Sequence, residues 1–389
     1  MYLHRALEKT LSLALKQFPV VLVTGPRQSG KSTLLQHQLK EGYKYLTFDD
    51  ILIRNFAQSD PDLFLKTNAV PLILDEIQYV PDLFSSLKIV VDQNRQNYGQ
   101  YVLTGSQVFA LMKGVSESLA GRIAIFQLYP LSFDEIVTVD VFDEMAVMNQ
   151  IFKGFYPEFQ VQPGLSPQLW HGAYLSSYLE RDLRSIRNIH DLGQFQRFLV
   201  LLAARAGQIL NLNEIGKECG ISQTTAKDWL TLLQATSIIY LLEPYSRNIT
   251  KRIVKSPKLF FVDTGLLCYL LRIANTEQLI YSPFSGHIFE NMVIMEKVKW
   301  FAARGERAPC YFYRTSSGLE IDLLIDEGSY VNAYEIKFSS SPSTEMTRSL
   351  FQFKEEQKVG EAVLLNLRRE ALPFSNGIIA RHWSTVYSN

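Results

Sequence analysis

The chain has 389 residues, 47% of them hydrophobic, which is enough for two or three domains with buried cores. Lysine plus arginine and aspartate plus glutamate both number 39, so the zero net charge excludes nucleic-acid binding through an overall basic surface and leaves only local patches. The three cysteines lie far apart without metal-ligand or disulfide spacing, and no apolar run is long enough to cross a membrane, so we expect a cytoplasmic protein without a membrane partner.

The first predicted element is an amphipathic helix within residues 1–16, and an apolar strand follows it. Residues 25–32 then read GPRQSGKS, which fits the phosphate-loop pattern G-x-x-x-x-G-K-[ST] at every fixed position. In this pattern the glycines let backbone N–H groups surround the phosphates of a nucleotide, Lys31 reaches the β- and γ-phosphates, and the Ser32 hydroxyl holds Mg²⁺. A helix-like stretch at residues 33–40 would place the phosphates at a positive helix N-terminus. The residues expected to bind nucleotide here are Gly25, Pro26, Arg27, Gln28, Ser29, Gly30, Lys31, Ser32 and Thr33.

The second half of the predicted nucleotide site is a continuous apolar run, residues 72–76, that ends in two carboxylates. Such a run is typical of a buried parallel strand whose carboxyl end meets the ligand. This is a Walker B element, in which Asp75 would hold Mg²⁺ through water and Glu76 would orient or deprotonate the water that attacks the γ-phosphate. With a strand at residues 43–48 and a helix at residues 81–95, the alternation of elements predicts a doubly wound α/β domain.

Further polar groups follow the next predicted strand, residues 100–104, and either Thr104 or Ser106 would contact the γ-phosphate. Arg122 precedes another predicted strand and would supply positive charge to the transition state, in its own chain or in a neighbouring one. A solvated loop cation fits the spacing of Arg122 equally well, and Arg27 in the phosphate loop is a second candidate.

Five motifs together resemble the prokaryotic AAA-type P-loop ATPases that carry a C-terminal domain of unknown function. They are the phosphate loop, LDEIQ at residues 74–78, TGS at 104–106, LAGR at 119–122 and YPLSF at 129–133. The resemblance covers the whole chain. It implies a parallel sheet of order 5-1-4-3-2, with the nucleotide at the carboxyl edge of the sheet.

The middle of the chain begins after a linker-like stretch, residues 160–167, with a predicted amphipathic helix at residues 170–182. Residues 212–233 then predict a helix-turn-helix, with Asn213 and Ser222 as the N-caps of its two helices. A β-like run after the second helix indicates a winged-helix module.

If this module binds DNA, the second helix faces the groove. Its expected contact residues are Gln223, Thr224, Thr225 and Lys227. A basic stripe without any acid follows between Glu243 and Asp263 and would follow a phosphate backbone. The stripe consists of Arg247, Lys251, Arg252, Lys255 and Lys258. Winged helices also contact proteins, so both a DNA partner and a protein partner stay open.

The C-terminal part carries a second group of charged residues in otherwise apolar elements. Glu290 lies on an amphipathic helix predicted at residues 286–299. Asp322 lies on a predicted strand, and Glu335 and Lys337 lie on the next strand, where period-two alternation places them on one face. Unpaired charges are costly to bury, which favours a site. The arrangement resembles the restriction-endonuclease-like superfamily, whose core is written PD…(D/E)xK, with Ile321 at the position of the proline.

This second resemblance implies that Asp322 and Glu335, with Glu290, bind Mg²⁺, which would polarise a phosphodiester and activate water. Lys337 would position that water or neutralise the charge of the transition state. The alternative is a nuclease-like fold that has lost its activity and serves as a binding scaffold.

The expected protein is therefore an α/β chain with ATP and Mg²⁺ as cofactors, which couples ATP hydrolysis to nucleic-acid engagement or cleavage by its C-terminal domain. The rival is a nucleotide-dependent switch that binds a protein partner. The predicted domains are residues 1–165 (AAA-type P-loop ATPase), 166–255 (helical linker and winged helix-turn-helix) and 256–389 (restriction-endonuclease-like).

Overall fold

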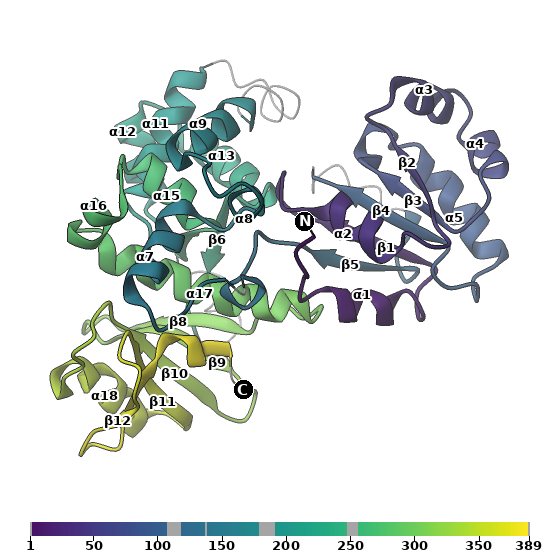
Figure 1. Cartoon of the computed structure of the whole chain (residues 1–389). Coiled ribbons are helices and arrows are strands. Elements are labelled where there is room, and N and C mark those ends of the chain that lie inside the picture. Colours follow the sequence, from purple (N-terminus) through teal and green to yellow (C-terminus); the bar gives the residue numbers. More distant parts are fainter. Residues whose placement is uncertain (1, 107–117, 137, 179–190, 247–255, 388–389) are drawn as a thin grey trace.

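The computed structural model describes residues 2–106, 118–136, 138–178, 191–246 and 256–387 (Figure 1). An N-terminal α/β unit, drawn in purple and blue, lies beside a helical part and a second sheet, drawn in teal, green and yellow. Within the described ranges no helix combines the length and the apolar character that a membrane span requires.

The N-terminal unit is built on a five-stranded parallel sheet of order β2-β3-β4-β1-β5. This confirms the order implied by the resemblance. The strands are β1 (Val20–Thr24), β2 (Lys44–Thr47), β3 (Leu72–Asp75), β4 (Tyr101–Gly105) and β5 (Ile123–Gln127). Alternate residues of β1 enter two different cores, Val20 and Leu22 on one face of the sheet and Val21 and Val23 on the other. Both faces are therefore covered, as expected for a doubly wound sheet.

Helices cover the two faces of this sheet (Figure 1). They are α1 (Glu8–Ala14), α2 (Lys31–Gln38), α3 (Ile51–Ser59), α4 (Pro61–Thr67), η1 (Ile77–Tyr79) and α5 (Leu83–Gln93). The Asp50 side chain caps α3 by accepting the N–H groups of Leu52 and Ile53.

The helical part follows β5. Its elements are η2 (Phe133–Glu135), α7 (Glu144–Lys153), α8 (Glu158–Val161), α9 (Pro167–Tyr178), α11 (Leu192–Ala203), α12 (Leu212–Cys219), α13 (Gln223–Ala235), β6 (Ile239–Leu242) and β7 (Lys258–Phe261). Gly220, with φ at 70°, makes the turn between α12 and α13, and Ser222 caps α13 as predicted. The cap of α12 is Asn211, so the prediction of Asn213 was two residues late. Strands β6 and β7 pair antiparallel.

The C-terminal part combines helices with a six-stranded mixed sheet of order β12-β13-β11-β10-β9-β8. Strands β8, β9 and β10 run antiparallel, whereas β10, β11 and β13 run parallel. The elements are α15 (Thr264–Leu270), α16 (Thr276–Tyr281), α17 (Ser285–Ala303), β8 (Cys310–Arg314), β9 (Glu320–Asp326), β10 (Val331–Ile336), η4 (Thr344–Thr347), α18 (Arg348–Glu356), β11 (Val359–Asn366), β12 (Leu372–Pro373), β13 (Ile379–His382) and η5 (Trp383–Tyr387).

One hydrophobic core runs from Tyr129 to Val386 and joins the helical part to the C-terminal sheet. Phe133, directly after the N-terminal sheet, packs against Trp383 near the end of the chain, with 4.8 Å between ring centroids. The predicted divisions at residues 165 and 255 do not follow this packing. Residues 129–159, assigned from the sequence to the first domain, contribute to the second core instead.

Candidate nucleotide site and carboxylate cluster

The predicted phosphate loop connects β1 to α2, as its sequence requires. Gly25 has φ at 145°, and a Cβ there would lie 2.2 Å from the carbonyl oxygen of Leu128, so only glycine fits. Gly30, with φ at 91°, stands at the N-cap of α2. The Lys31 ammonium donates to the carbonyls of Gly25 and Pro26, at 3.1 and 2.8 Å. The lysine thus lies folded across the loop into which a phosphate would enter.

The two halves of the predicted nucleotide site meet at Asp75, at the carboxyl end of β3. The Ser32 hydroxyl donates to its Oδ1 at 2.9 Å, the Thr104 hydroxyl donates to the same oxygen, and Tyr45 donates to its Oδ2 at 2.6 Å. Burial and the bond to Asp75 raise the pKa of Tyr45. Tyr45 was missed from the sequence, because its contact with Asp75 depends on β2 lying next to β3.

Glu76 follows Asp75 with φ at 55°, a left-handed backbone that costs on the order of 1–3 kcal/mol in a residue other than glycine. Such strain is typical of functional positions. The Glu76 carboxylate accepts a hydrogen bond from Gln78. On the adjacent strand end, Thr104 is bound to Asp75, whereas the buried Ser106 hydroxyl lacks a hydrogen-bond partner among the described residues. Ser106 is therefore the better placed of the two for a phosphate oxygen.

Arg122 does not reach this site in its own chain. Val20, the first residue of β1, pairs in register with Ile123, so Arg122 lies at the amino edge of the sheet and the phosphate loop at the carboxyl edge. Its guanidinium binds both carboxylate oxygens of Asp92, at 2.6 and 2.9 Å. The expected role of Arg122 within its own chain is therefore wrong. Strands in a parallel sheet start at the edge opposite the one that binds the phosphates.

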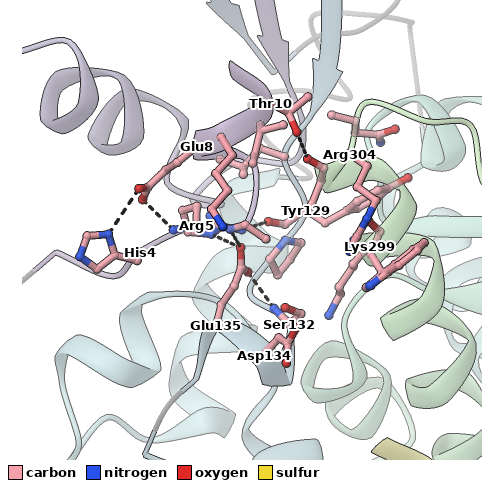
Figure 2. Close-up of a pocket in the computed structure, with 18 of the residues that line it drawn as sticks. His4, Arg5, Glu8, Thr10, Tyr129, Ser132, Asp134, Glu135, Lys299 and Arg304 are labelled. Atoms are coloured by element: carbon pink, nitrogen blue, oxygen red, sulfur yellow. Dashed lines mark hydrogen bonds and ion pairs between the residues drawn. The ribbon is translucent and has the colours of Figure 1, made fainter. Parts of the chain in front are cut away.

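The N-terminal segment adds a residue that the motifs did not indicate. Arg5 is 7% exposed and donates to the carbonyl of Ser29 in the phosphate loop and to the carbonyl of Tyr129, both at 2.7 Å. Its Nε donates to Glu135 at 3.0 Å, and this carboxylate also accepts the N–H of Ser132. Figure 2 shows Arg5 between these groups, with Lys299 on the opposite wall of the pocket.

Two cavities flank Arg5. The larger, about 530 Å³, is the one in Figure 2 and lies where the N-terminal segment, the stretch after β5 and the end of α17 meet. The smaller, about 230 Å³, borders the phosphate loop itself. It is lined by Tyr2, Leu3, Arg5, Gln28, Gly30, Thr33, Leu131, Pro157, Glu158 and Val161.

The C-terminal residues singled out in the sequence do come together, in a group that we call the carboxylate cluster: Glu290, Glu320, Asp322 and Glu335, with Lys258 and Lys337. Lys337 lies 2.8 Å from Glu335 and 3.6 Å from Asp322. Burial and the nearby Asp322 raise the pKa of Glu335 to about 8, and the same two causes raise the pKa of Glu290.

Lys258 occupies the middle of the carboxylate cluster. Its Nζ lies 2.6 Å from Glu320, 3.2 Å from Glu290 and 3.8 Å from Asp322. Burial alone would lower the pKa of Lys258, but these carboxylates outweigh it and raise the pKa. The prediction that Lys258 belongs to an exposed basic stripe was wrong, because β7 carries the side chain into the protein, where it is 2% exposed.

The other predicted nucleic-acid contacts divide into two groups. Gln223, Thr224 and Lys227 are exposed on α13, and Thr225 is half-buried beside the Ser222 cap. The remaining stripe residues, Arg247, Lys251, Arg252 and Lys255, lie outside the described residues.

Comparisons with known proteins match three successive parts of the chain. Residues 17–137 match a family described as an AAA domain, and residues 145–277 and 285–385 match domains of unknown function, DUF8612 and DUF4143. The uncharacterized protein Rv2008c of Mycobacterium tuberculosis is 30% identical over 371 residues, which cover 95% of this chain and 81% of that protein. The uncharacterized protein MJ1544 of Methanocaldococcus jannaschii is 24% identical over 351 residues, covering 82% and 75% of the two chains. Among solved structures, the Walker-type ATPase of Pyrococcus abyssi is 16% identical with a TM-score of 0.47, covering 69% of this chain and 95% of that one.

Proposed function

We propose that this chain, which belongs to the family of the mycobacterial protein Rv2008c and carries an AAA domain, is a Mg²⁺-dependent ATPase whose nucleotide state controls how its C-terminal half engages nucleic acid. The ATPase part has the stronger support, because residues from both predicted halves of the nucleotide site lie in contact, Ser32 with Asp75.

The observation that carries the ATPase function is the hydrogen bond between Ser32 and Asp75. These oxygens lie side by side at the carboxyl edge of a parallel sheet, and hard oxygen ligands fit Mg²⁺. Ser32 and Asp75 would hold Mg²⁺, whose positive charge would offset the negative charge that develops on the phosphates. Lys31 exchanges its two carbonyl partners for phosphate oxygens, Glu76 orients the attacking water, and Ser106 donates to the γ-phosphate.

The smaller cavity beside the phosphate loop would take the base and ribose of the nucleotide. Gln28, Gly30 and Thr33 bring the loop and α2 to one wall, while Tyr2 and Pro157 close the others. A nucleotide bound there would contact the region around α8, since Pro157, Glu158 and Val161 line the cavity.

Nucleotide binding and hydrolysis are tested with two variants. In Lys31→Ala we expect ATP binding to be lost, measured by titration with a fluorescent ATP analogue, without a change in circular dichroism. In Glu76→Gln we expect binding to persist while hydrolysis falls by about 10²-fold or more, because the water is no longer oriented. Unchanged affinity in Lys31→Ala would overturn the assignment of the site.

Nucleic-acid engagement is supported by the order of α11, α12, α13 and the antiparallel β6–β7 pair, an order compatible with a winged helix-turn-helix. Gln223, Thr224 and Lys227 present exposed polar side chains at the start of α13, where such modules contact a groove. A gel shift with double-stranded DNA is expected to weaken steeply with salt. Lys227→Ala should weaken it at every salt concentration, and the matched control Lys66→Ala, on the exposed face of α4, should not.

The second candidate function is a nucleotide-dependent switch that binds a protein. It is favoured by the described part of α13, where Lys227 is the one basic residue. Absence of binding to single- and double-stranded DNA at low salt, with ATP hydrolysis intact, would favour this reading.

A further inference from the structure

We propose that the carboxylate cluster uses the ammonium group of Lys258 in place of a divalent metal ion, so that the nuclease-like part of the chain is a binding scaffold. The inference concerns this cluster alone and does not depend on the ATPase activity.

Lys258 is held in the carboxylate cluster by its backbone as well as by its charge. It ends the β6–β7 pair, opposite Leu242, and forms an isolated bridge with Ile209. Its Cα is therefore fixed by two neighbouring segments, and its side chain has one direction in which to extend. That direction leads between Glu290 of α17 and Glu320 of β9.

Apart from Glu335 Oε2, the other carboxylate oxygens of the cluster contact cations or a backbone N–H group, and they are not arranged around a metal position. Asp322 Oδ2 accepts the N–H of Ile336 at 2.9 Å and faces Lys337, which also binds Glu335 Oε1. Glu335 Oε2 is buried and lacks a hydrogen-bond partner within the described ranges, so one acceptor points inward unused. Asp322 Oδ1 faces Lys258 and Glu290 Oε2 faces His287, each at 3.8 Å, so the other oxygens point toward resident cations or an N–H group. They are not gathered around one position in the way that Mg²⁺ or Ca²⁺ needs, with several oxygens at about 2.0–2.6 Å.

The charges lead to the same conclusion. Four carboxylates face Lys258, Lys337, Arg314 and His287; Arg314 lies 3.2 Å from Glu320, and His287 lies 3.8 Å from Glu290. A divalent ion bound by Glu290 and Asp322 would lie beside the ammonium of Lys258, and like charges at such a distance repel strongly in a buried site. No set of three acidic, histidine or cysteine side chains in the described part of the chain is arranged to hold a metal ion. The predicted Mg²⁺ site at Glu290, Asp322 and Glu335 therefore does not fit this geometry.

The test is a thermal-unfolding titration of the full chain with Mn²⁺, without nucleotide. Wild type and Lys258→Arg, which keep a cation in the cluster, should show no response that depends on Glu335. Lys258→Met should be less stable without metal and should gain about 2 °C or more in Tm with Mn²⁺, because the freed carboxylates then bind the ion. The gain should disappear in Lys258→Met combined with Glu335→Gln.

The matched control is Lys299→Met. Lys299 is also buried and pairs with a glutamate, Glu296, at 2.9 Å, but it lies at the other end of α17. Its loss should destabilise the protein without any Mn²⁺ rescue. If Lys258→Met is recovered unfolded, refolding with and without Mn²⁺ gives the same comparison.

Two outcomes would overturn the inference. One is a Mn²⁺-induced rise of Tm in wild type that Glu335→Gln removes. The other is nicking of supercoiled plasmid by wild type with Mg²⁺ or Mn²⁺ that Lys337→Ala removes. Intact plasmid, together with Mn²⁺ rescue of Lys258→Met, supports the resident ammonium.

Discussion

Asp75 is fixed before any nucleotide arrives, because three hydroxyl groups donate to its two oxygens. Ser32 and Asp75 were predictable, since each belongs to a pattern of fixed spacing. Tyr45 was not predictable, because it contacts Asp75 from the neighbouring strand, and the spacing of residues along the chain does not reveal which strands pair or in what register. Arg5 escaped for the same reason, as its partners Ser29 and Glu135 are distant in sequence.

Removing the Tyr45 hydroxyl tests whether it orients Asp75 for Mg²⁺. In Tyr45→Phe we expect the Mg²⁺ concentration for half-maximal ATP hydrolysis to rise by roughly 10-fold, because groups that orient a metal-binding carboxylate contribute about this much to affinity. Tyr43→Phe is the matched control. Tyr43 packs against the same core of the N-terminal sheet as Tyr45, but its hydroxyl donates to the carbonyl of Gly99 and not to Asp75. Equal Mg²⁺ requirements in both variants would contradict the role of Tyr45.

Among the elements, the buried helix α17 differs most from its sequence-based description. The sequence predicted an amphipathic helix at residues 286–299, but every residue from Ile288 to Lys299 is buried. The reason is its position, because α17 contacts α15, β10, β5 and η5 and thus has protein on all sides. A helix between layers shows no polar stripe, and its charged residues Glu290, Glu296 and Lys299 are paired inside the protein.

Through Arg5, the N-terminal segment before α1 connects the phosphate loop to the residues that follow β5. In Arg5→Ala we expect a loss of ~3 kcal/mol in the free energy of unfolding, because Glu135 keeps a buried carboxylate without its cation. ATP affinity should fall as well, since the carbonyl of Ser29 loses its donor. Urea denaturation and nucleotide titration measure the two effects. His4→Ala is the control, because the His4 side chain is 82% exposed. Unchanged stability and ATP affinity in Arg5→Ala would show that the contacts of Arg5 contribute to neither.

For the whole molecule, the resemblance to the AAA-type ATPases implied the order of the N-terminal sheet, and the sequence pattern singled out four charged residues that meet in the C-terminal part. It did not predict which segments share a core. The breakers at residues 160–167 indicated a boundary, but this exposed or half-buried stretch is the end of α8 and its connection to the start of α9. The continuous core is decided by long-range contacts such as Phe133 with Trp383, for which no local pattern exists.

We expect His382, which ends β13 and packs against Trp383 of this core, to make the stability of the protein depend on pH. Its ring packs 4.7 Å from the Phe142 ring, and burial lowers the pKa of His382 to about 4. The unfolded chain, with an ordinary pKa of about 6.5, binds the proton more readily between these values. The free energy of unfolding should therefore fall as pH drops from about 6.5 to about 4. His382→Asn, which keeps an acceptor for Ser384, should reduce this slope in urea denaturation. A slope equal to that of wild type would assign the effect to other groups.

The pairing of Phe133 with Trp383 also sets an order of events during synthesis. The N-terminal sheet is complete once β5 has left the ribosome. Phe133, in residues 129–159, packs against Trp383, which is synthesised about 250 residues later. At about 5–20 residues per second, the ribosome needs roughly 12–50 s to deliver it. During that interval the apolar side chains of residues 129–159 are not yet buried by the C-terminal residues of the same core. We therefore expect chaperones to bind this stretch of the nascent chain.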